Sequence, residues 1–119
     1  MSEPAALPSA SRLFAWELSL AQKTSGGFKT PFGDYAEQTA LLGTLTDITA
    51  QDGVVSLLRI SDPTGICNAV PDRNNAALME SAAKLEAPSF LYLFGTLRIR
   101  THRGTAYPEL SAEDIQPVS

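Results

Sequence analysis

The stretch Val54-Val-Ser-Leu-Leu-Arg-Ile-Ser-Asp-Pro-Thr-Gly-Ile-Cys-Asn-Ala-Val70 decides the fold. It predicts a strand over residues 54–61, a tight turn at Asp62-Pro-Thr-Gly65 and a second strand over residues 66–70. Proline in the second position of the turn presets φ, and glycine in the fourth position is favoured in a type I turn. The first strand has one apolar face and one mixed face. A hairpin of this kind is typical of the centre of a small closed β-barrel.

The residues before the hairpin predict two more strands. Residues 12–20 alternate, with Phe14, Trp16, Leu18 and Leu20 on one parity, which favours a strand over a short helix. Residues 21–35 are rich in glycine and aromatic residues and predict a loop. Residues 39–48 predict the next strand, in which Gly43 indicates a bulge or a sharp bend. Asp52-Gly53 is a favoured pair for the turn that leads into the hairpin.

The residues after the hairpin predict one helix, over residues 76–87. Leu78, Ala82 and Leu85 form its apolar stripe, and an Asn or Asp among residues 71–75 is expected to cap its first turn. Pro88 is expected to end it.

The rest of the chain predicts two final strands. Residues 89–99 form a long strand, residues 100–104 a polar turn and residues 105–110 the last strand, followed by a short helical turn at residues 111–114. A helix between the third and fourth of five strands is the order of the oligonucleotide/oligosaccharide-binding fold (OB fold). The sequence therefore predicts an all-β protein: a five-stranded Greek-key barrel with an extra N-terminal strand.

Composition limits the class of protein. With 119 residues there is room for one domain, which we expect over residues 11–119 behind a flexible tail at residues 1–10. The formal net charge of −4 argues against strong, non-specific binding to duplex DNA but leaves room for a local basic strip. The chain has no apolar run long enough to span a membrane and no signal-peptide pattern at its start, so we expect a cytoplasmic protein.

The sequence offers no catalytic or metal-binding pattern. A single cysteine, Cys67, and a single histidine, His102, provide neither an internal disulfide nor a zinc cluster. There is no glycine-rich phosphate loop and no paired-cysteine motif. Cys67 lies in an apolar strand and is interpreted as an inert small residue. We therefore expect a binding module with no enzymatic activity, cofactor or metal.

Several motifs resemble one family. Leu42-Gly-Thr-Leu-Thr46, Arg59-Ile-Ser-Asp-Pro-Thr-Gly65 and Glu86-Ala-Pro-Ser-Phe-Leu-Tyr-Leu-Phe-Gly95 are similar to archaeal replication protein A-like modules that bind single-stranded DNA. The start, Arg12-Leu-Phe-Ala15, resembles most closely the archaeal proteins associated with replication protein A. The resemblance covers roughly residues 12–118. It implies an accessory to the single-strand-binding machinery of DNA replication and repair, whose partner is nucleic acid or a replication protein A-like protein.

The OB fold predicts where a nucleic acid would lie. In this fold the second and third strands and the loops 1–2 and 4–5 form the binding groove. If Leu58 and Ile60 face the interior, parity predicts that Leu57, Arg59, Cys67 and Ala69 face that groove. The candidate contacts for single-stranded DNA, or for RNA, are Arg59, Arg98, Arg100, His102, Arg103 and Tyr107, which combine cations with a ring for base stacking. The alternative is that the basic residues are merely a solvated hairpin end.

A protein partner is the second hypothesis. The aromatic residues Phe28, Phe32 and Tyr35, together with the apolar N-terminal strand, are candidates for docking on replication protein A or a similar complex, with little direct nucleic-acid binding. The simpler interpretation is that they clamp their loop onto the barrel, as Phe14 and Trp16 are expected to lock the extra strand. The strand at residues 66–70 has no aromatic ring on which a base could stack, which argues against tight direct binding to a single strand. The net charge favours the protein-partner hypothesis, and the local basic cluster favours the nucleic-acid hypothesis. The oligomeric state is left open.

Overall fold

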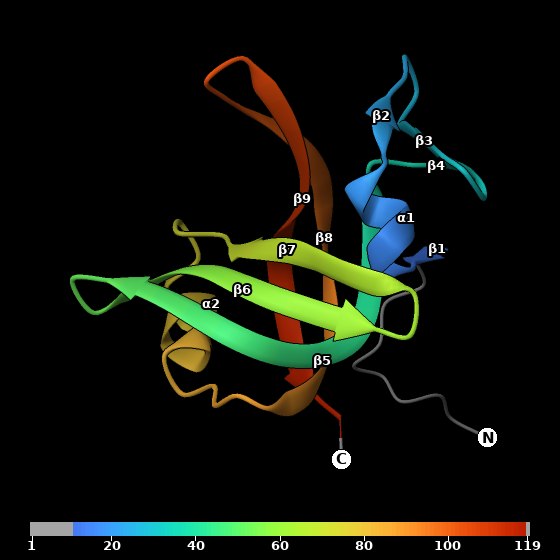
Figure 1. Ribbon diagram of the computed structural model, residues 1–119. Coiled ribbons are helices and arrows are strands. Elements are labelled where there is room, and N and C mark those ends of the chain that lie inside the picture. The colour runs from blue at the N-terminus through green and yellow to red at the C-terminus, as the bar shows by residue number, and fades with distance from the viewer. Residues whose placement is uncertain (1–10, 119) are drawn as a thin grey trace.

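An antiparallel hairpin of β6 (Val54–Asp62) and β7 (Gly65–Pro71) forms the front of a closed β-barrel (Figure 1). The computed structural model describes residues 11–118. β5 (Gln38–Gln51) pairs with β6 on one side and with β8 (Ser89–His102) on the other.

β9 completes the closure. This strand (Thr105–Pro117) pairs antiparallel with β8 and parallel with β7. Helix α2 (Ala76–Ala82) follows the third barrel strand. The predicted OB-fold barrel, with a helix between its third and fourth strands, is confirmed.

β5 serves two sides of the barrel because it bends near Gly43. A Cβ atom at Gly43 would lie 2.7 Å from both Ile60 Cγ2 and the Ser61 carbonyl oxygen, so only glycine lets β6 approach this closely. The β5–β6 register shifts just after this point, between Leu45 and Asp47. The bend expected from Gly43 is therefore confirmed, with the bulge slightly later in the strand.

The strand β9 is longer than predicted. The expected helical turn at residues 111–114 is wrong, because β9 stays paired with β8 as far as Pro117. Phe94 pairs with Asp114 and Gly95 with Ala112, which leaves Glu113 as an extra residue in a bulge. The bulge lets Ala112 and Ile115 both face the core. Because of the bulge, buried residues in this strand are three positions apart, which is the spacing expected for a helix.

The helix α2 is shorter than predicted. It ends at Ala82 instead of residue 87. The Asn75 side chain caps its start by accepting a hydrogen bond from the Leu78 N–H at 3.0 Å. Leu78 and Ala82 are buried, as expected. Pro88 does not explain this early end, because it restricts only Ala87. After Ala82 the chain tightens into single turns, in which the N–H groups of Lys84 and Leu85 donate to the carbonyls of Ser81 and Ala82 at 3.1 and 3.2 Å.

The N-terminal region differs most from the prediction. The extra strand exists but is short: β1 (Ser11–Leu13) pairs in parallel with β5. The chain then turns into helix α1 (Ala15–Ser19), so the strand expected over residues 12–20 is wrong beyond Leu13.

The predicted loop at residues 21–35 contains a small antiparallel sheet. Its strands are β2 (Gln22–Lys23), β3 (Phe28–Thr30) and β4 (Gly33–Tyr35). Residues 11–37 are called the N-terminal arm below.

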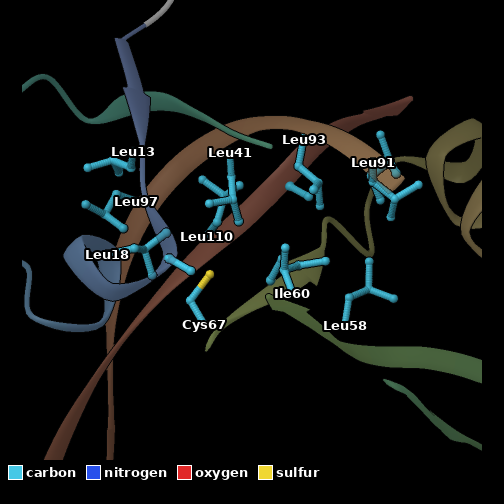
Figure 2. Packing of buried hydrophobic residues seen from close by; sticks show 14 of the residues in the cluster. Leu13, Leu18, Leu41, Leu58, Ile60, Cys67, Leu91, Leu93, Leu97 and Leu110 are labelled. Carbon is cyan, nitrogen blue, oxygen red and sulfur yellow. The ribbon is translucent and has the colours of Figure 1, made fainter. Parts of the chain in front are cut away.

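The two helices lie at opposite ends of the core. Figure 2 shows the buried side chains in a row, with Leu13, Leu18 and Leu97 near α1 and Leu58 and Leu91 toward α2. α1 contributes Ala15 and Leu18, both fully buried. No helix in the described part of the chain has the length and apolar character needed to cross a membrane. The tail predicted at residues 1–10 lies outside the described residues.

Candidate nucleic-acid interface

Three arginines, Arg98, Arg100 and Arg103, lie close together in the hairpin of β8 and β9, which projects beyond the barrel (Figure 1). Residues 98–109 are called the β8–β9 arm below. Directly paired residues of antiparallel strands point to the same side of the sheet. Arg100 pairs with Tyr107, His102 with Thr105 and Arg98 with Glu109. The cations of β8 therefore share one face of the arm with Tyr107, whose side chain is 42% exposed.

Only one of the arginines of the β8–β9 arm, Arg100, pairs with a carboxylate of the arm itself. Arg100 Nε lies 3.0 Å from Glu109 Oε1, and Glu109 is buried. Arg98, His102 and Arg103 are exposed and form no ion pair within residues 11–118. Arg103 occupies the tip, where it adopts a φ of +52° in a turn with Gly104. These three side chains remain available to an anionic ligand.

A hollow of about 510 Å³ separates the base of this arm from the N-terminal arm. The Leu97 N–H donates to the Glu37 carbonyl at 2.8 Å and holds the two arms together there. Lys23 lies in this hollow, 3.6 Å from a Glu37 carboxylate oxygen and 5.4 Å from the centre of the Phe28 ring. The hollow is lined by Lys23, Phe28, Glu37, Thr96, Leu97, Arg98 and Ile99.

The outer sheet face of β6 carries the remaining predicted cation. Arg59 is exposed and Leu57 half-buried, and both line a hollow of about 310 Å³ with Asp47, Ile48 and Thr49. Arg59 and Arg98 line different hollows. The predicted nucleic-acid residues therefore fall into two groups: one on the arm and one, Arg59, on the sheet.

The predicted orientation of β7 is wrong. Cys67 and Ala69 are 5% and 0% exposed, because they pair with Ile60 and Leu58, which face the core. The outward residues of β7 are Ile66, Asn68 and Val70, which offer no aromatic ring. Burial and the negative charge of Asp62 raise the pKa of the Cys67 thiol to about 12, so the thiol stays protonated. This fits its interpretation as an inert residue.

The three predicted partner residues have different environments. Phe28 is 1% exposed and belongs to the core, and Tyr35 is half-buried. A hydrogen bond between the Tyr35 hydroxyl and Glu17, together with burial and the Glu17 charge, raises the pKa of Tyr35 to about 12. Phe28 and Tyr35 thus hold the arm together. Only Phe32, at 58% exposure, presents its ring to solvent.

Two more exposed aromatic residues lie in the N-terminal segment that was expected to take part in partner docking, although neither was singled out for it. Phe14 and Trp16 are 37% and 41% exposed, so the expectation that they lock a strand onto the barrel is wrong. The ring of Phe32 lies 6.2 Å from that of Phe14 and 5.6 Å from that of Trp16. Phe14, Trp16 and Phe32 are called the aromatic cluster below. The three-residue spacing of Ala15 and Leu18 fits a helix that turns Trp16 outward, but over five residues this spacing is too weak a signal to reveal the cluster against the alternation that favours a strand.

Comparison with known proteins supports the fold. No family model and no curated protein sequence matches the chain. A chain from the Stn1–Ten1 complex of S. pombe is similar in structure, with a TM-score of 0.59 and 18% identity over 72% of this chain. This protein spans 61% of that chain. A chain of a replication protein A heterotrimer bound to ssDNA has a TM-score of 0.62 and 13% identity over 93% of this chain and 83% of its own.

The similar structures differ in how much of this chain they match, and the replication protein A chain also matches the N-terminal arm. Because the N-terminal arm is more than a fifth of the chain, the replication protein A match at 93% includes most of it. The asparaginyl-tRNA synthetase of Pyrococcus horikoshii matches 68% of this chain with 19% of its own, at 24% identity and a TM-score of 0.55. The fold therefore occurs both in binding proteins and within an enzyme. At these identities the likenesses establish the OB fold and nothing narrower.

Proposed function

We propose that this protein binds single-stranded nucleic acid through the β8–β9 arm and acts as an accessory to a replication protein A-like machinery in DNA replication or repair. The observation that carries the proposal is the shared face of the arm, on which Arg98 and His102 lie beside Tyr107. In this proposal the chain is a cytoplasmic binding module and not an enzyme.

The arm combines the two features that single-strand binding requires. Arg98, His102 and Arg103 have no ion pair among the described residues and can contact phosphates, while the half-exposed Tyr107 ring can stack on a base. A stacked base contributes about 1–3 kcal/mol, so one ring and a few cations support weak to moderate affinity.

We expect the outer face of β5 and β6 to contribute less to nucleic-acid binding than the β8–β9 arm. Arg59 is its one cation, and Asp47 lies directly opposite it in the β5–β6 register. Asp52, in the turn that joins β5 to β6, adds a second negative charge at the tip of this hairpin. We therefore assign Arg59 a supporting role and place the main phosphate contacts on the arm.

The accessory role is an analogy at the level of the fold. The likeness to a chain of a replication protein A heterotrimer bound to ssDNA and to a chain of the Stn1–Ten1 complex supports it, since both of those chains belong to assemblies. Fold alone does not decide function, so this role depends on direct tests.

Docking on a protein partner is the second candidate function. The exposed aromatic cluster and the net charge of −4 favour it. The OB fold is compatible with protein recognition: a similar structure, with a TM-score of 0.58 and 14% identity over 68% of this chain, is an OBody bound to hen egg-white lysozyme.

Salt dependence separates the two candidates. The affinity for fluorescein-labelled oligothymidylate and oligouridylate is measured by anisotropy at several salt concentrations. We expect log affinity to fall with log salt with a slope of about −1 to −3, because each neutralised phosphate of a single strand contributes about −0.7. A slope near zero, or no binding at low salt, would overturn the nucleic-acid proposal. Oligodeoxyuridylate and oligouridylate differ only in the 2′-hydroxyl, so comparing these two decides between DNA and RNA.

A further inference from the structure

We propose that Glu109 is a positioning residue of the nucleic-acid interface: it anchors the Arg100 guanidinium, so that Arg100 is a fixed phosphate contact on the β8–β9 arm. The inference rests on the proposed function, because it needs a single strand bound to this arm. It gives a role to the arm's one carboxylate, which stands against three arginines and which charge alone would count as unfavourable for binding.

Glu109 is buried although it lies on a hairpin that projects beyond the barrel. The residue is 8% exposed, whereas the side chain of Arg100 is 54% exposed. Glu109 pairs with Arg98 in the β8–β9 register, and its Oε1 lies 3.0 Å from Arg100 Nε. The carboxylate therefore shares one face of the arm with both arginines and lies deeper than either.

The Arg100 guanidinium is the main compensation for this buried carboxylate. Glu109 Oε1 is enclosed and accepts no hydrogen bond from the described residues, and Arg100 is the one cation among residues 11–118 within ion-pair distance of it. Removing one partner of a buried pair leaves an uncompensated charge, which costs far more than the loss of an exposed ion pair. Arg100 therefore stays beside Glu109 when a ligand arrives.

Arg100 can keep this contact and still bind an anion. A guanidinium has five N–H donors in a rigid planar fork. The carboxylate is at ion-pair distance from Nε, and more than half of the Arg100 side chain is exposed. The terminal Nη groups can therefore donate to a phosphate while Nε stays beside Glu109. Because the guanidinium is already held in place, less side-chain freedom is lost on binding.

Removing the Glu109 charge separates positioning from simple electrostatics. If Glu109 acted only through its charge, Glu109→Gln would make the arm more cationic and would tighten binding to a polyanion. If Glu109 anchors Arg100, the same substitution should weaken binding to oligothymidylate about threefold or more. The slope of log affinity on log salt should also become shallower by about 0.7, the share of one single-strand phosphate.

Glu113→Gln is the matched control. Glu113 lies in the same strand and carries the same charge, but its Oε2 accepts from the Thr96 hydroxyl at 2.6 Å and does not pair with an arginine. We expect this variant to bind at least as tightly as the wild type. In an Arg100→Ala background, Glu109→Gln should no longer weaken binding, because the group that it positions is absent.

The buried pair is also tested without nucleic acid. Arg100→Ala should melt at a temperature about 4 °C or more below that of Arg98→Ala, because it leaves the Glu109 carboxylate buried and unpaired. Adding Glu109→Gln to Arg100→Ala should restore most of this loss. Equal melting temperatures for Arg98→Ala and Arg100→Ala would contradict the anchoring of Arg100 by Glu109.

Two binding results overturn the role of Glu109 alone. One is a wild type that binds oligothymidylate and a folded Glu109→Gln variant that binds equally well or more tightly. The other is an equal loss of affinity in Glu109→Gln and Glu113→Gln. If the wild type itself does not bind, the proposed function fails and the role of Glu109 fails with it. The wild-type titration therefore distinguishes the failure of the proposed function from the failure of this inference.

Discussion

The Asp62 carboxylate accepts a hydrogen bond from the backbone N–H of Ala15 at 2.8 Å, across 47 positions of sequence. Its other oxygen accepts from the N–H groups of Thr64, at 2.8 Å, and Gly65, at 3.2 Å. The Asp-Pro-Thr-Gly turn therefore closes the β6–β7 hairpin and also caps α1. Burial alone would raise the pKa of Asp62, but the hydrogen bonds from Thr64, Ala15 and Gly65 outweigh it and lower the pKa.

Asp62→Asn should destabilise the N-terminal arm. We expect the free energy of unfolding at pH 7 to fall by about 1–2 kcal/mol, because both Asp62 oxygens accept from backbone N–H groups and the Asn amide has only one acceptor oxygen. The pKa of Asp62 is lower in the folded state than its unfolded value of about 3.8. The ionised carboxylate therefore stabilises the fold fully above pH 3.8, and this stabilisation is lost as pH falls through the folded-state pKa. In urea unfolding, the difference in free energy of unfolding between the wild type and Asp62→Asn should therefore be smaller at pH 3 than at pH 7. Asp47→Asn, at an exposed position, is the control, and equal stability of the two variants would contradict this role.

Tyr35 makes stability sensitive to alkali. Its pKa is raised to about 12 by the hydrogen bond to Glu17, by burial and by the Glu17 charge, so the folded state favours the neutral phenol. This contribution is complete below the unfolded pKa of 10.0 and is lost as pH rises toward 12. Between pH 10 and pH 12 the free energy of unfolding should fall more for the wild type than for Tyr35→Phe. Parallel declines in urea unfolding at pH 9 and 11.5 would exclude the Tyr35–Glu17 bond as the cause.

Gly95→Ala should disrupt the pairing of β8 and β9. A Cβ atom at Gly95 would lie 2.0 Å from the Ser111 carbonyl oxygen, and backbone atoms cannot move aside as a flexible side chain can. We expect a loss of about 1–3 kcal/mol or more, the range for overpacking, as measured by thermal melting. Gly26→Ala is the control, since nothing lies within 4 Å of its Cβ position. Similar melting temperatures for both variants would contradict the close approach of the strands.

Cys67 should resist thiol reagents in the folded protein. It is 5% exposed, and burial and the Asp62 charge raise the pKa of its thiol to about 12. Reaction with a disulfide reagent at pH 8 should be slow without denaturant and rapid in urea above the unfolding midpoint, because the thiolate is the reactive form. Rapid reaction in native buffer would indicate that β7 opens or that its side chains are turned outward.

The barrel was predictable from the sequence because its signals are local. The alternating strand before Asp62, the tight turn and a single helix after the third strand identify the OB fold. The orientation of β7 was also predictable, although it was predicted wrongly. A two-residue connection that pairs Asp62 with Gly65 must place Cys67 opposite Ile60, and a residue opposite a buried residue is itself buried.

The N-terminal arm was not predictable from local pattern. The alternation of Phe14, Trp16 and Leu18 fits a strand, and a five-residue helix contributes too little periodicity to compete with it. What selects the helix is tertiary: Asp62 and Thr64 hydrogen-bond to N–H groups that are far away in sequence. For the same reason the aromatic cluster was missed, whereas the basic arm, a local run of residues, was found.

The most direct test of the proposed function is charge reversal on the β8–β9 arm. The affinity of the double variant Arg98→Glu/Arg103→Glu for an oligothymidylate of about 16 nucleotides, the upper site size of an OB fold, is compared at low salt with that of Arg73→Glu/Lys84→Glu. Both variants change net charge equally. We predict that the arm variant binds at least about tenfold more weakly than wild type and has a shallower salt slope, while the control stays within about threefold. Equal losses in both variants, or no loss in the arm variant, would contradict the assignment of the arm as the nucleic-acid interface.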